Sequence, residues 1–463
     1  MIVMKFGGTS NQDASAMTNV IRIVKAHLQL QPVVVISAIA NSTNELEETA
    51  RVAARGDENG ASAIVTRLFE RHNKIIDNLI HSRLVARDLE GVFYQHLTEI
   101  KELVKGVAIL RELTPRTMDT ICSYGERLSS RIIAAGLKEA GVDSVWVDAK
   151  EFMITDDNFG CARPLMDKVA TNLHSKVRPI LQGGKTPVTQ GFIGVTSGGA
   201  YTTLGRESSD YSAAIIGAAM DAVKVQIWTD VDGVLTADPR IVDSTKKLNR
   251  LTFEEAFELS YFGAKVLHPS TMLPLIEKNI PVQILNSRSE GTGTFVDIYA
   301  DTGHDDVLKS VVYKRNLAII TVTPKQRFGQ FVFWENIFSV LTQTGSTTGM
   351  MATSEYSIAF TVDSTVDPVN LVHKLEQFGK VEIVQGKASL CLVGKGLRGR
   401  SSVSNRIFDC LSDLPIYMIS YGASELNMAI VIDEEKIPDA VGRLHREFFE
   451  TGTLSETFES LPK

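Results

Sequence analysis

Short stretches of the sequence combine glycines, charged side chains and hydroxyl groups in a way that suits phosphate binding. The first, Lys5-Phe6-Gly7-Gly8-Thr9-Ser10, follows an apolar run at the start of the chain. Glycines at a strand-to-helix turn let backbone N–H groups approach an anion, and the N-terminus of the following helix adds partial positive charge. Lys5 adds a full charge at the strand end. An ordinary tight turn after an edge lysine remains the alternative for this stretch taken alone.

A second stretch, Thr202–Asp210, precedes the apolar helical pattern Tyr211–Met220. Arg206 suits a bidentate contact with a carboxylate, because its guanidinium is a rigid planar fork. Asp210 at the helix start is well placed to hold a lysine or a metal ion. Ser209 or Asp210 could equally cap the helix, since both residue types satisfy free N–H groups there.

Two further stretches lie late in the first part of the chain. Thr229–Arg240 follows the strand pattern Val223–Trp228, a position that favours a nucleotide contact. A loop rich in turn residues would account for the same Asp, Gly and Pro content. The segment Phe262–Pro269 carries Lys265 after a glycine, and a solvated surface lysine is its ordinary interpretation.

Polar residues at other predicted strand and helix ends complete the candidates. Glu126 lies near the start of a predicted helix in Ser123–Ser130. It is either a surface carboxylate favoured by the helix dipole or a ligand for a substrate ammonium group. Ser37 ends a predicted strand and Thr43 follows in a polar loop; both are weak candidates alone.

The elements that must position these residues alternate along the first 300 or so positions of the chain. Helical patterns separate short runs rich in Val and Ile, and this alternation predicts an α/β fold with a mostly parallel sheet covered by helices. Active sites of such folds collect at the carboxyl ends of the strands. The predicted strands are Met1–Phe6, Val33–Ser37, Ser144–Val147, Pro187–Gln190, Val223–Trp228 and Pro281–Leu285.

An internal repeat follows a loop-like stretch at Asn286–Gly293. Seven residues recur at a constant offset of 70 without a gap: Ile337, Phe338, Leu341, Ser354, Glu355, Ala359 and Asp363 return as Ile407, Phe408, Leu411, Ser424, Glu425, Ala429 and Asp433. The matching periodicity predicts a tandem pair of small α+β units, because two copies of so long a period are too few for a solenoid. We expect their sheets to pack against each other or against a second subunit.

Composition excludes several classes of protein. The 463 residues carry a formal net charge of −7, with 44% hydrophobic and 22% charged residues, which argues against disorder, nucleic-acid binding and anionic membranes. No apolar run approaches the roughly 18 residues of a membrane helix, and a secretory signal is lacking. The cysteines and histidines show no metal-ligand spacing. We therefore expect a cytoplasmic protein.

One apparent phosphate-binding motif is misleading. Gly183-Gly184-Lys185-Thr186 looks like the end of a P-loop, but Pro179 stands where that pattern requires a glycine. It also leads into a predicted strand instead of following one, so we predict a turn. The protein-kinase signatures and the GxSxG elbow are absent from the sequence.

In this order the motifs resemble those of the aspartokinases of the amino-acid kinase family, over nearly the whole chain. The last segment is most similar to the monofunctional, lysine-sensitive branch. The resemblance rests on KFGGTS at 5–10, SYGERLS at 123–129, QGFIG at 190–194, TTLGR and SD within 202–210, TDVDGV and DPR within 229–240, FGAKVLHP at 262–269 and MISYGAS at 418–424.

The resemblance implies an amino-acid kinase fold with two ACT domains behind it, and the reaction of MgATP with L-aspartate to give ADP and 4-phospho-L-aspartate. This is the first step of lysine, threonine and methionine biosynthesis. The implied domains are a catalytic domain over 1–297, a first ACT domain over 316–394 and a second over 395–450 with a strand from 305–315.

Family positions also imply roles for individual residues. Lys5 and Asp210 would be catalytic, and Mg²⁺ would be held mainly through the ATP phosphates. The ATP-binding positions would be Lys5, Phe6, Gly7, Gly8, Thr229, Asp230, Leu235, Arg240, Lys265 and Val266. The aspartate-binding positions would be Ser37, Thr43, Glu126, Phe192, Arg206 and Ser209.

The family resemblance also implies that an amino acid regulates the enzyme. ACT domains of this family bind end-product amino acids, which implies a lysine or threonine effector and a homodimer or homotetramer joined through these domains. Packing and dimerisation alone are the alternative. Gly349 stands where lysine-sensitive relatives commonly have an acidic residue. The effector candidates are Phe333, Thr347, Thr348, Ser354 and Glu355.

Departures from the family pattern and other functions stay open. Glu207-Ser208 replaces two glycines common in relatives, and Leu235 replaces a tyrosine found in some. An amino-acid kinase acting on another carboxylate or on a carbamate is one alternative function. A catalytically silent amino-acid sensor is another, which the retained Lys5, Arg206 and Asp210 argue against. We expect no homoserine dehydrogenase extension, since the chain ends soon after the second repeat.

Overall fold

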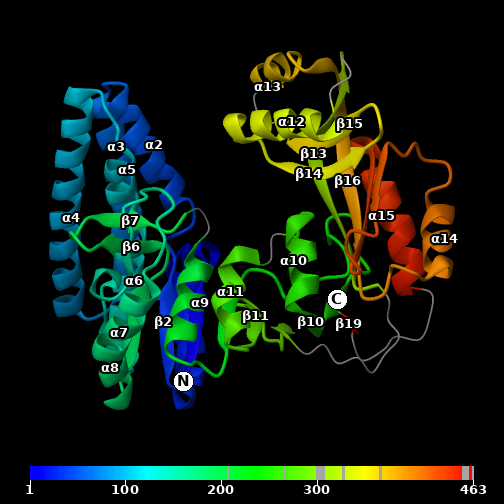
Figure 1. Cartoon of the computed structure of the whole chain (residues 1–463). Coiled ribbons are helices and arrows are strands. Elements are labelled where there is room, and N and C mark those ends of the chain that lie inside the picture. Colours follow the sequence, from blue (N-terminus) through cyan, green and yellow to red (C-terminus); the bar gives the residue numbers. More distant parts are fainter. Residues whose placement is uncertain are drawn as a thin grey trace. The chain divides into compact units, whose positions relative to one another are not determined.

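The apolar runs expected to be strands lie side by side in one largely parallel sheet of the computed structural model (Figure 1). The order of its strands from β12 onward is β12-β11-β8-β1-β2-β5-β3, and all of these are parallel except β12. The short strand β10 (Arg250–Thr252) precedes β12 in the same sheet. Nearly every residue of the central strands is buried, as expected of a sheet with both faces covered. The strands are β1 (Ile2–Phe6), β2 (Pro32–Ile36), β3 (Ser144–Trp146), β5 (Thr186–Gln190), β8 (Val225–Thr229), β11 (Val282–Asn286) and β12 (Thr294–Asp297).

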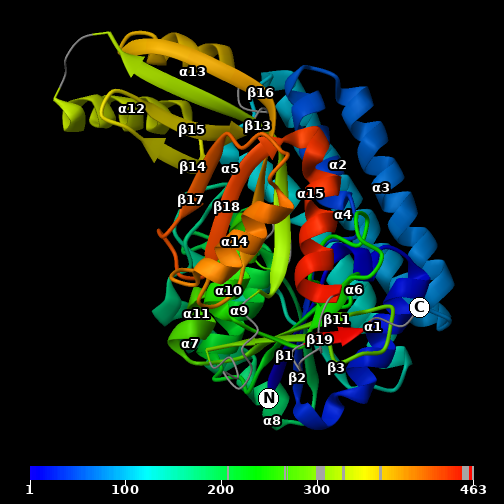
Figure 2. The same cartoon turned by 90° about the vertical axis from the view of Figure 1, so that its right-hand side faces the viewer.

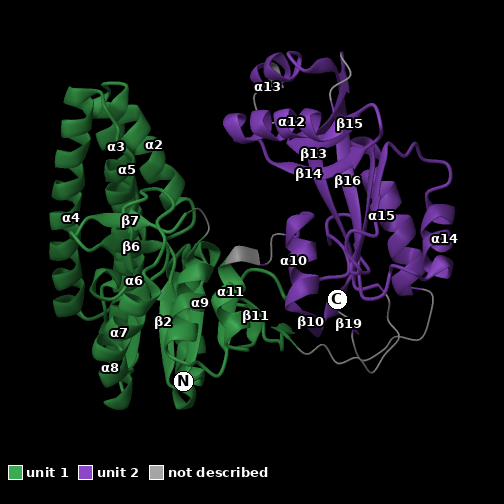
Figure 3. Ribbon diagram, viewed as in Figure 1, with its two compact units in different colours: residues 1–233, 270–298 green, residues 234–269, 299–463 purple. Residues whose placement is uncertain are grey.

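The structure describes residues 1–205, 208–264, 267, 269–298, 308–325, 329–363, 368–450 and 458–460. The chain divides into two compact units (Figure 3). Unit 1 comprises Met1–Gly233 and Ser270–Ile298, and unit 2 comprises Val234–Pro269 and Tyr299–Lys463. The segment Val234–Pro269 therefore groups with the repeat, although the sequence assigns it to the catalytic domain. Within the described residues, no helix is long and apolar enough to cross a membrane.

Helices connect the strands of unit 1, as the α/β prediction requires. Helix α6 packs on β2, β3 and β5, and α9 packs on β1, β2 and β8. A small sheet, β4 (Ile154–Thr155), β6 (Ile193–Thr196) and β7 (Tyr201–Thr203), lies in the same unit. The helices are α1 (Ala14–Ala26), α2 (Ser42–Ala54), α3 (Glu58–Leu79), α4 (Arg83–Leu110), α5 (Pro115–Cys122), α6 (Tyr124–Glu139), α7 (Met166–Lys176), α8 (Arg178–Gln182), α9 (Ser209–Ala219) and α11 (Pro269–Glu277).

Unit 2 is built around one antiparallel sheet in the order β14-β15-β13-β16-β18-β17. Its strands are β13 (Ser310–Pro324), β14 (Thr348–Thr353), β15 (Ile358–Asp363), β16 (Gly379–Val393), β17 (Met418–Tyr421) and β18 (Asn427–Asp433). Its helices are α10 (Phe253–Tyr261), α12 (Gln330–Thr344), α13 (Pro368–Leu375), α14 (Ser401–Cys410) and α15 (Ile437–His445). The short strands β9 (Lys246–Leu248), β10 (Arg250–Thr252) and β19 (Phe458–Ser460) complete the unit.

The repeat is visible in this sheet, but the two copies do not form two separate sheets. Strands β13 and β16 are 15 residues each and pair along their length, so they join the copies edge to edge (Figure 2). The expectation that two small sheets pack against each other is wrong for this chain. At matching positions of the two strands, Asn316 and Gly386 adopt φ of 57° and 69°, where the pairing register shifts. The left-handed conformation suits Asn and Gly better than other residues.

Each half of the sheet has its own apolar core. Helices α12 and α13 cover the half that contains β15, with Ile337 and Leu371 among the buried side chains. Helices α14 and α15 cover the half that contains β18, with Ile407 and Leu444 buried in the same way. Residues at the start of β13, such as Val311, belong to this second core. Each copy thus uses part of a strand that continues into the other.

Candidate active site

The turn after β1 is fixed by its neighbouring strands. The Gly7 amide donates to the Trp228 carbonyl of β8 at 3.0 Å, and the Ser37 amide donates to the Phe6 carbonyl at 3.1 Å. A Cβ added at Gly8 would lie 3.0 Å from the Ala38 carbonyl oxygen, so the turn passes close over the end of β2. A Cβ at Gly7 would lie 3.6 Å from the Lys5 Nζ. The tight position is Gly8, where a side chain would press on the backbone at the end of β2, whereas a Cβ at Gly7 would make only ordinary contact.

Lys5 forms an ion pair with Asp210 at the start of α9. The distance from Lys5 Nζ to Asp210 Oδ1 is 2.6 Å, and the side chains are 12% and 18% exposed. The helix N-cap is Ser208, and no side-chain cap hydrogen bond forms there. The capping alternative for Ser209 and Asp210 is therefore wrong, since Asp210 turns toward the lysine and not toward its own helix.

A short segment separates the glycine turn from the helix expected to follow it. A short 3₁₀ helix, Gly8–Asn11, comes first, and α1 begins only at Ala14. Asp13 caps α1, with its Oδ1 accepting from the Ala16 amide at 2.8 Å. The partial charge of that helix end is thus met by its own carboxylate. The helix end that contacts Lys5 is the first turn of α9, through Asp210.

Glu126 lies in the first turn of α6 and is 3% exposed. Its Oε1 accepts from the Ala38 amide at 3.1 Å, and its Oε2 has no hydrogen-bond partner among the described residues. Burial raises the pKa of Glu126 to about 8, with the Ala38 amide opposing the shift. The surface-carboxylate alternative is excluded. A buried carboxylate oxygen without a donor suits a ligand that brings positive charge and N–H groups.

Ser37 and Thr43 lie on either side of the Ala38 contact. The Ser37 carbonyl accepts from the Ser129 hydroxyl of α6 at 2.8 Å, which ties the end of β2 to the helix that carries Glu126. Thr43 is half-buried in the first turn of α2. The end of β2, the glycine turn and the start of α6 thus meet at the carboxyl edge of the sheet.

Phe192 and Ser209 form a second group next to Asp210. A Cβ at Gly191 would lie 2.7 Å from the Ser209 Cβ, so the chain passes against the start of α9. Phe192 has a φ of 66°, and its amide donates to the Ser212 hydroxyl at 2.9 Å. A positive φ is strained for an aromatic residue and clusters at functional sites. Phe192 is also almost fully buried, so its ring has a fixed position.

The predicted nucleotide positions are spread over both units. Thr229 ends β8, next to β1 in the sheet, and its hydroxyl donates to Asp230 at 3.2 Å. Leu235 and Arg240 belong to unit 2, and Arg240 is an exposed side chain paired with Asp238 at 2.7 Å. Three predicted site residues lie outside the described residues, namely Arg206, Lys265 and Val266.

The effector candidates of unit 2 differ in environment. Phe333 is 4% exposed and belongs to the apolar core under α12, so its side chain does not line a pocket. Thr347, Ser354 and Glu355 are exposed, and Thr348 is half-buried. The Tyr261 hydroxyl of α10 lies 3.0 Å from the Thr348 carbonyl and accordingly ties β14 to that helix.

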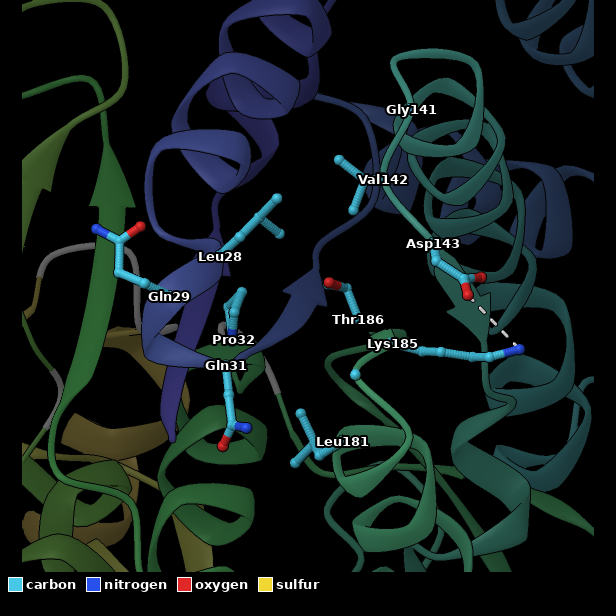
Figure 4. A pocket seen from close by; sticks show the side chains of 11 residues that line it. Leu28, Gln29, Gln31, Pro32, Gly141, Val142, Asp143, Leu181, Lys185 and Thr186 are labelled. Atoms are coloured by element: carbon cyan, nitrogen blue, oxygen red, sulfur yellow. Dashed lines mark ion pairs between the residues drawn. The ribbon is translucent and has the colours of Figure 1, made fainter.

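A pocket of about 320 Å³ lies at the opposite edge of the main sheet (Figure 4). Pro32 and Thr186, the first residues of β2 and β5, line it with Asp143 and Lys185, whose charged atoms are 3.6 Å apart. The stretch that looked like a P-loop contributes to this pocket and is a turn into β5, as predicted. The pocket is therefore separate from the candidate site at the carboxyl ends.

Asp119 of α5, which was not among the candidates from the sequence, fixes the end of β7 near the candidate site. This carboxylate is 2% exposed and accepts from the Gly160 amide, the Thr203 amide and the Thr203 hydroxyl at 2.8–2.9 Å. Burial raises its pKa, and these hydrogen bonds oppose the shift. It holds the end of β7, three residues before Arg206 in the sequence. Nothing in its sequence surroundings distinguishes it from a surface aspartate. Among the described residues, no group of three or more His, Cys, Asp or Glu could hold a metal.

Comparison with known proteins matches this geometry to a family. The model of the amino acid kinase family covers residues 1–286, and an ACT-domain model covers residues 390–448. Lysine-sensitive aspartokinase 3 of Escherichia coli is 32% identical, with 97% of this chain and 99% of that protein aligned. The chain belongs to the aspartokinases.

Other aspartokinases are also similar to this chain over nearly its whole length. Aspartokinase 1 of Arabidopsis thaliana, a chloroplastic protein, is 35% identical over 98% of this chain and 81% of its own length. The crystal structure of E. coli aspartokinase III with aspartate and ADP, in the R-state, gives a TM-score of 0.84 at 32% identity over 97% of this chain and all of that one. The T-state structure of the same enzyme, with lysine and aspartate, gives 0.82 at 32% identity over 97% and 99% of the two chains.

Proposed function

We propose that this aspartokinase transfers the γ-phosphoryl group of ATP to the side-chain carboxylate of L-aspartate, giving ADP and 4-phospho-L-aspartate. The observation that carries the proposal is the Lys5–Asp210 ion pair, which lies against the glycine turn at the carboxyl edge of the sheet. Support also comes from the E. coli relative, whose structure was solved with aspartate and ADP.

The chemistry needs little from the protein beyond charge and position. A carboxylate oxygen of aspartate attacks the γ-phosphorus, and the bond to the bridging oxygen of ADP breaks. The attacking group is already ionised near neutral pH, so no general base is needed. The obstacle is the repulsion between two anions, which Lys5 and the Gly8 amide would reduce. The Gly7 amide is not available for this role, because it donates to the Trp228 carbonyl. Mg²⁺ would enter with the phosphates and neutralise charge on them.

Aspartate would be held at both of its charged ends. The free Oε2 of Glu126 fits the α-ammonium group, because that group supplies the donor and the charge that this buried oxygen lacks. Arg206 is assigned to a carboxylate by family position. Ser37, Thr43, Phe192 and Ser209 would line the rest of the pocket.

The nucleotide would contact Phe6 and the segment that follows β8. Family position assigns Thr229, Asp230, Leu235 and Arg240 to it, together with Lys265 and Val266. Leu235 would contribute aliphatic contact where some relatives have an aromatic ring.

Regulation by an amino acid is the further part of the proposal. The E. coli relative was solved with lysine in its T-state, which supports lysine as the first effector to test and threonine as the second. Gly349 offers no carboxylate for a lysine ammonium group, so the affinity would depend on other groups. A homodimer or homotetramer joined by the ACT domains and a cytoplasmic location also stay predictions.

A hydroxamate-trapping assay tests the reaction directly. Hydroxylamine converts an acyl phosphate into a coloured hydroxamate, so the signal should require ATP, Mg²⁺ and L-aspartate together. A panel of other carboxylates under the same conditions would reveal a different acceptor. ATP consumption without any acceptor dependence would contradict the proposal. Repeating the assay with lysine and with threonine tests regulation, and no inhibition by either would leave the ACT domains an assembly role.

A further inference from the structure

The loop after β8 contacts β13 and α15 of unit 2 through Thr236, which is fully buried. The Thr236 amide donates to the Lys246 carbonyl, and the Val311 amide of β13 donates to the Thr236 carbonyl, both at 2.9 Å. The Thr236 Oγ1 accepts from the Lys246 amide at 2.9 Å. The loop that carries Leu235 and Arg240 is therefore held by backbone hydrogen bonds to β9 and to the start of β13.

His445 at the end of α15 completes the hydrogen bonds of Thr236. Its ring is fully buried, with Nε2 2.9 Å from the Thr236 Oγ1 and Nδ1 3.0 Å from the Glu450 Oε1. A carboxylate only accepts, so Nδ1 carries the proton and Nε2 accepts from the threonine hydroxyl. Burial lowers the pKa of His445, which favours this neutral form. Every polar atom of the histidine and the threonine hydroxyl is thus used.

The backbone after α15 is irregular where this contact is made. Arg446–Glu450 form a π-helical turn. The wider turn brings residue 450 alongside residue 445, which the spacing of an α-helix would place on different faces. The Glu450 Oε1 also accepts from the Ser244 hydroxyl at 2.5 Å, so the same carboxylate reaches back to the segment beyond the loop. Such turns are uncommon and often occur at functional sites.

Apolar packing supports the same attachment. Ala237 and Val242 lie in one core with Val311, Leu444 and Phe449. In Figure 2, α15 lies beside β13, which matches their contact. The loop is therefore packed on α15 and on the start of β13, in the core under α14 and α15.

We propose that His445 is a positioning residue for the nucleotide: through Thr236 it holds the loop that presents Leu235 and Arg240. This rests on the proposed function, which assigns those two residues to ATP. If the contact is lost, the loop spends less time in its binding conformation, and the apparent affinity falls by that fraction. Aspartate recognition by Glu126 lies in unit 1 and does not use this contact.

Paired substitutions test the contact in the full-length chain. His445→Asn keeps a donor for Glu450 but is too short to reach Thr236, whereas His445→Gln places an amide oxygen near the former Nε2 and restores an acceptor. We expect His445→Asn and Thr236→Val each to raise the dissociation constant of ADP, measured with Mg²⁺ by calorimetry, by about 3–10-fold. His445→Gln should bring the constant back to within about twofold of the original chain.

Controls separate this role from general destabilisation. Val441→Ala truncates a fully buried apolar side chain of the same helix and core and removes no hydrogen bond of Thr236 or His445. It should lower the melting temperature and leave ADP affinity unchanged. The double variant of Thr236→Val and His445→Asn should bind ADP no more weakly than Thr236→Val alone, since the hydrogen bond lost in His445→Asn is already absent there.

Different results would overturn different statements. Failure of the unaltered chain to bind ADP would contradict the proposed function itself. Unchanged ADP affinity in His445→Asn and Thr236→Val would overturn the positioning role alone. The positioning role would also be overturned if Val441→Ala lost as much ADP affinity as these variants. An equally large rise in the KM for aspartate in these variants would overturn it too.

Discussion

Two lysine–aspartate ion pairs, one in each unit, have the same chemistry and opposite surroundings. Lys5 and Asp210 pair between β1 and α9 in unit 1. Lys387 and Asp433 pair directly across the antiparallel strands β16 and β18 in unit 2. The Lys387 Nζ also lies 3.7 Å from the centre of the Tyr417 ring, whose hydroxyl donates to the Asp433 Oδ2 at 3.3 Å.

The difference lies in what else faces each pair. In unit 2, the tyrosine covers the ammonium group and supplies a donor to the aspartate, so the pair is complete. In unit 1, the lysine faces a turn whose glycines lack side chains, and Glu126 in the same region keeps an unpaired oxygen. An ion pair becomes a candidate site when its neighbourhood leaves room and unused hydrogen-bonding groups for a ligand.

The largest expected effect is on the first pair. Lys5→Ala should lower kcat by at least about 10²–10³, because a preset positive charge beside the transferring phosphoryl is lost. The melting temperature should also fall, because the mostly buried Asp210 loses its partner. Initial rates with saturating ATP and aspartate measure the effect on kcat. Near-normal turnover would remove Lys5 from the mechanism and make the two pairs equivalent.

Glu126→Gln should raise the KM for aspartate by about 10–100-fold, since a charged hydrogen bond to the ammonium group becomes a neutral one. Kcat at saturation should fall much less. The pKa of about 8 adds a pH signature. Only the ionised carboxylate attracts the ammonium group, so the KM of the original chain should fall as pH rises between about pH 6 and pH 9. A pH profile that stays the same in Glu126→Gln would contradict the assignment.

Burial of Glu126 should also lower the free energy of unfolding at neutral pH. Because the folded pKa of Glu126 lies above its unfolded value of 4.5, folding binds a proton, and the stability falls as pH rises from 4.5 to about 8. Glu126→Gln lacks this term and should melt at a higher temperature than the original chain, with a difference that grows over that range. Calorimetric scans at several pH values would show it. A constant difference would mean that Glu126 ionises freely in the folded protein.

The smallest effect belongs to the complete pair. Lys387→Met keeps the aliphatic stem and removes the charge, which should lower the free energy of unfolding by about 1 kcal/mol and leave kcat unchanged. The hydrogen bond from Lys387 lowers the pKa of Asp433. The stability from this pair is therefore present above the unfolded aspartate pKa and is lost as the pH falls through the lowered one. Denaturant unfolding at neutral and acidic pH measures both.

Much of the architecture was accessible from local sequence patterns. Runs such as Val33–Ser37 became buried parallel strands, and the offset of 70 between Ile337 and Ile407 reappears in helices α12 and α14. The family resemblance also implied that Lys5 and Asp210 act together, and they pair between the end of β1 and the first turn of α9. These properties depend on periodicity and on topology rules that act over short distances in sequence.

Features that depend on distant partners could not be predicted in this way. The grouping of Val234–Pro269 with unit 2 rests on contacts such as Thr236 with His445, which are 209 residues apart. The unpaired oxygen of Glu126 and the strained φ of Phe192 follow from how whole elements pack. Asp210 pairs and does not cap because Lys5 is nearby, and no pattern within its own helix reveals that.

The long strands β13 and β16 have a consequence for how the second unit can be divided. Each repeat completes its half of the sheet with part of β13 or β16, and both strands continue into the half that belongs to the other repeat. A gene cut between the copies would leave either product with an open row of N–H and C=O groups, a surface prone to self-association. The duplicated halves can therefore diverge in side chains, but they must be synthesised and kept together.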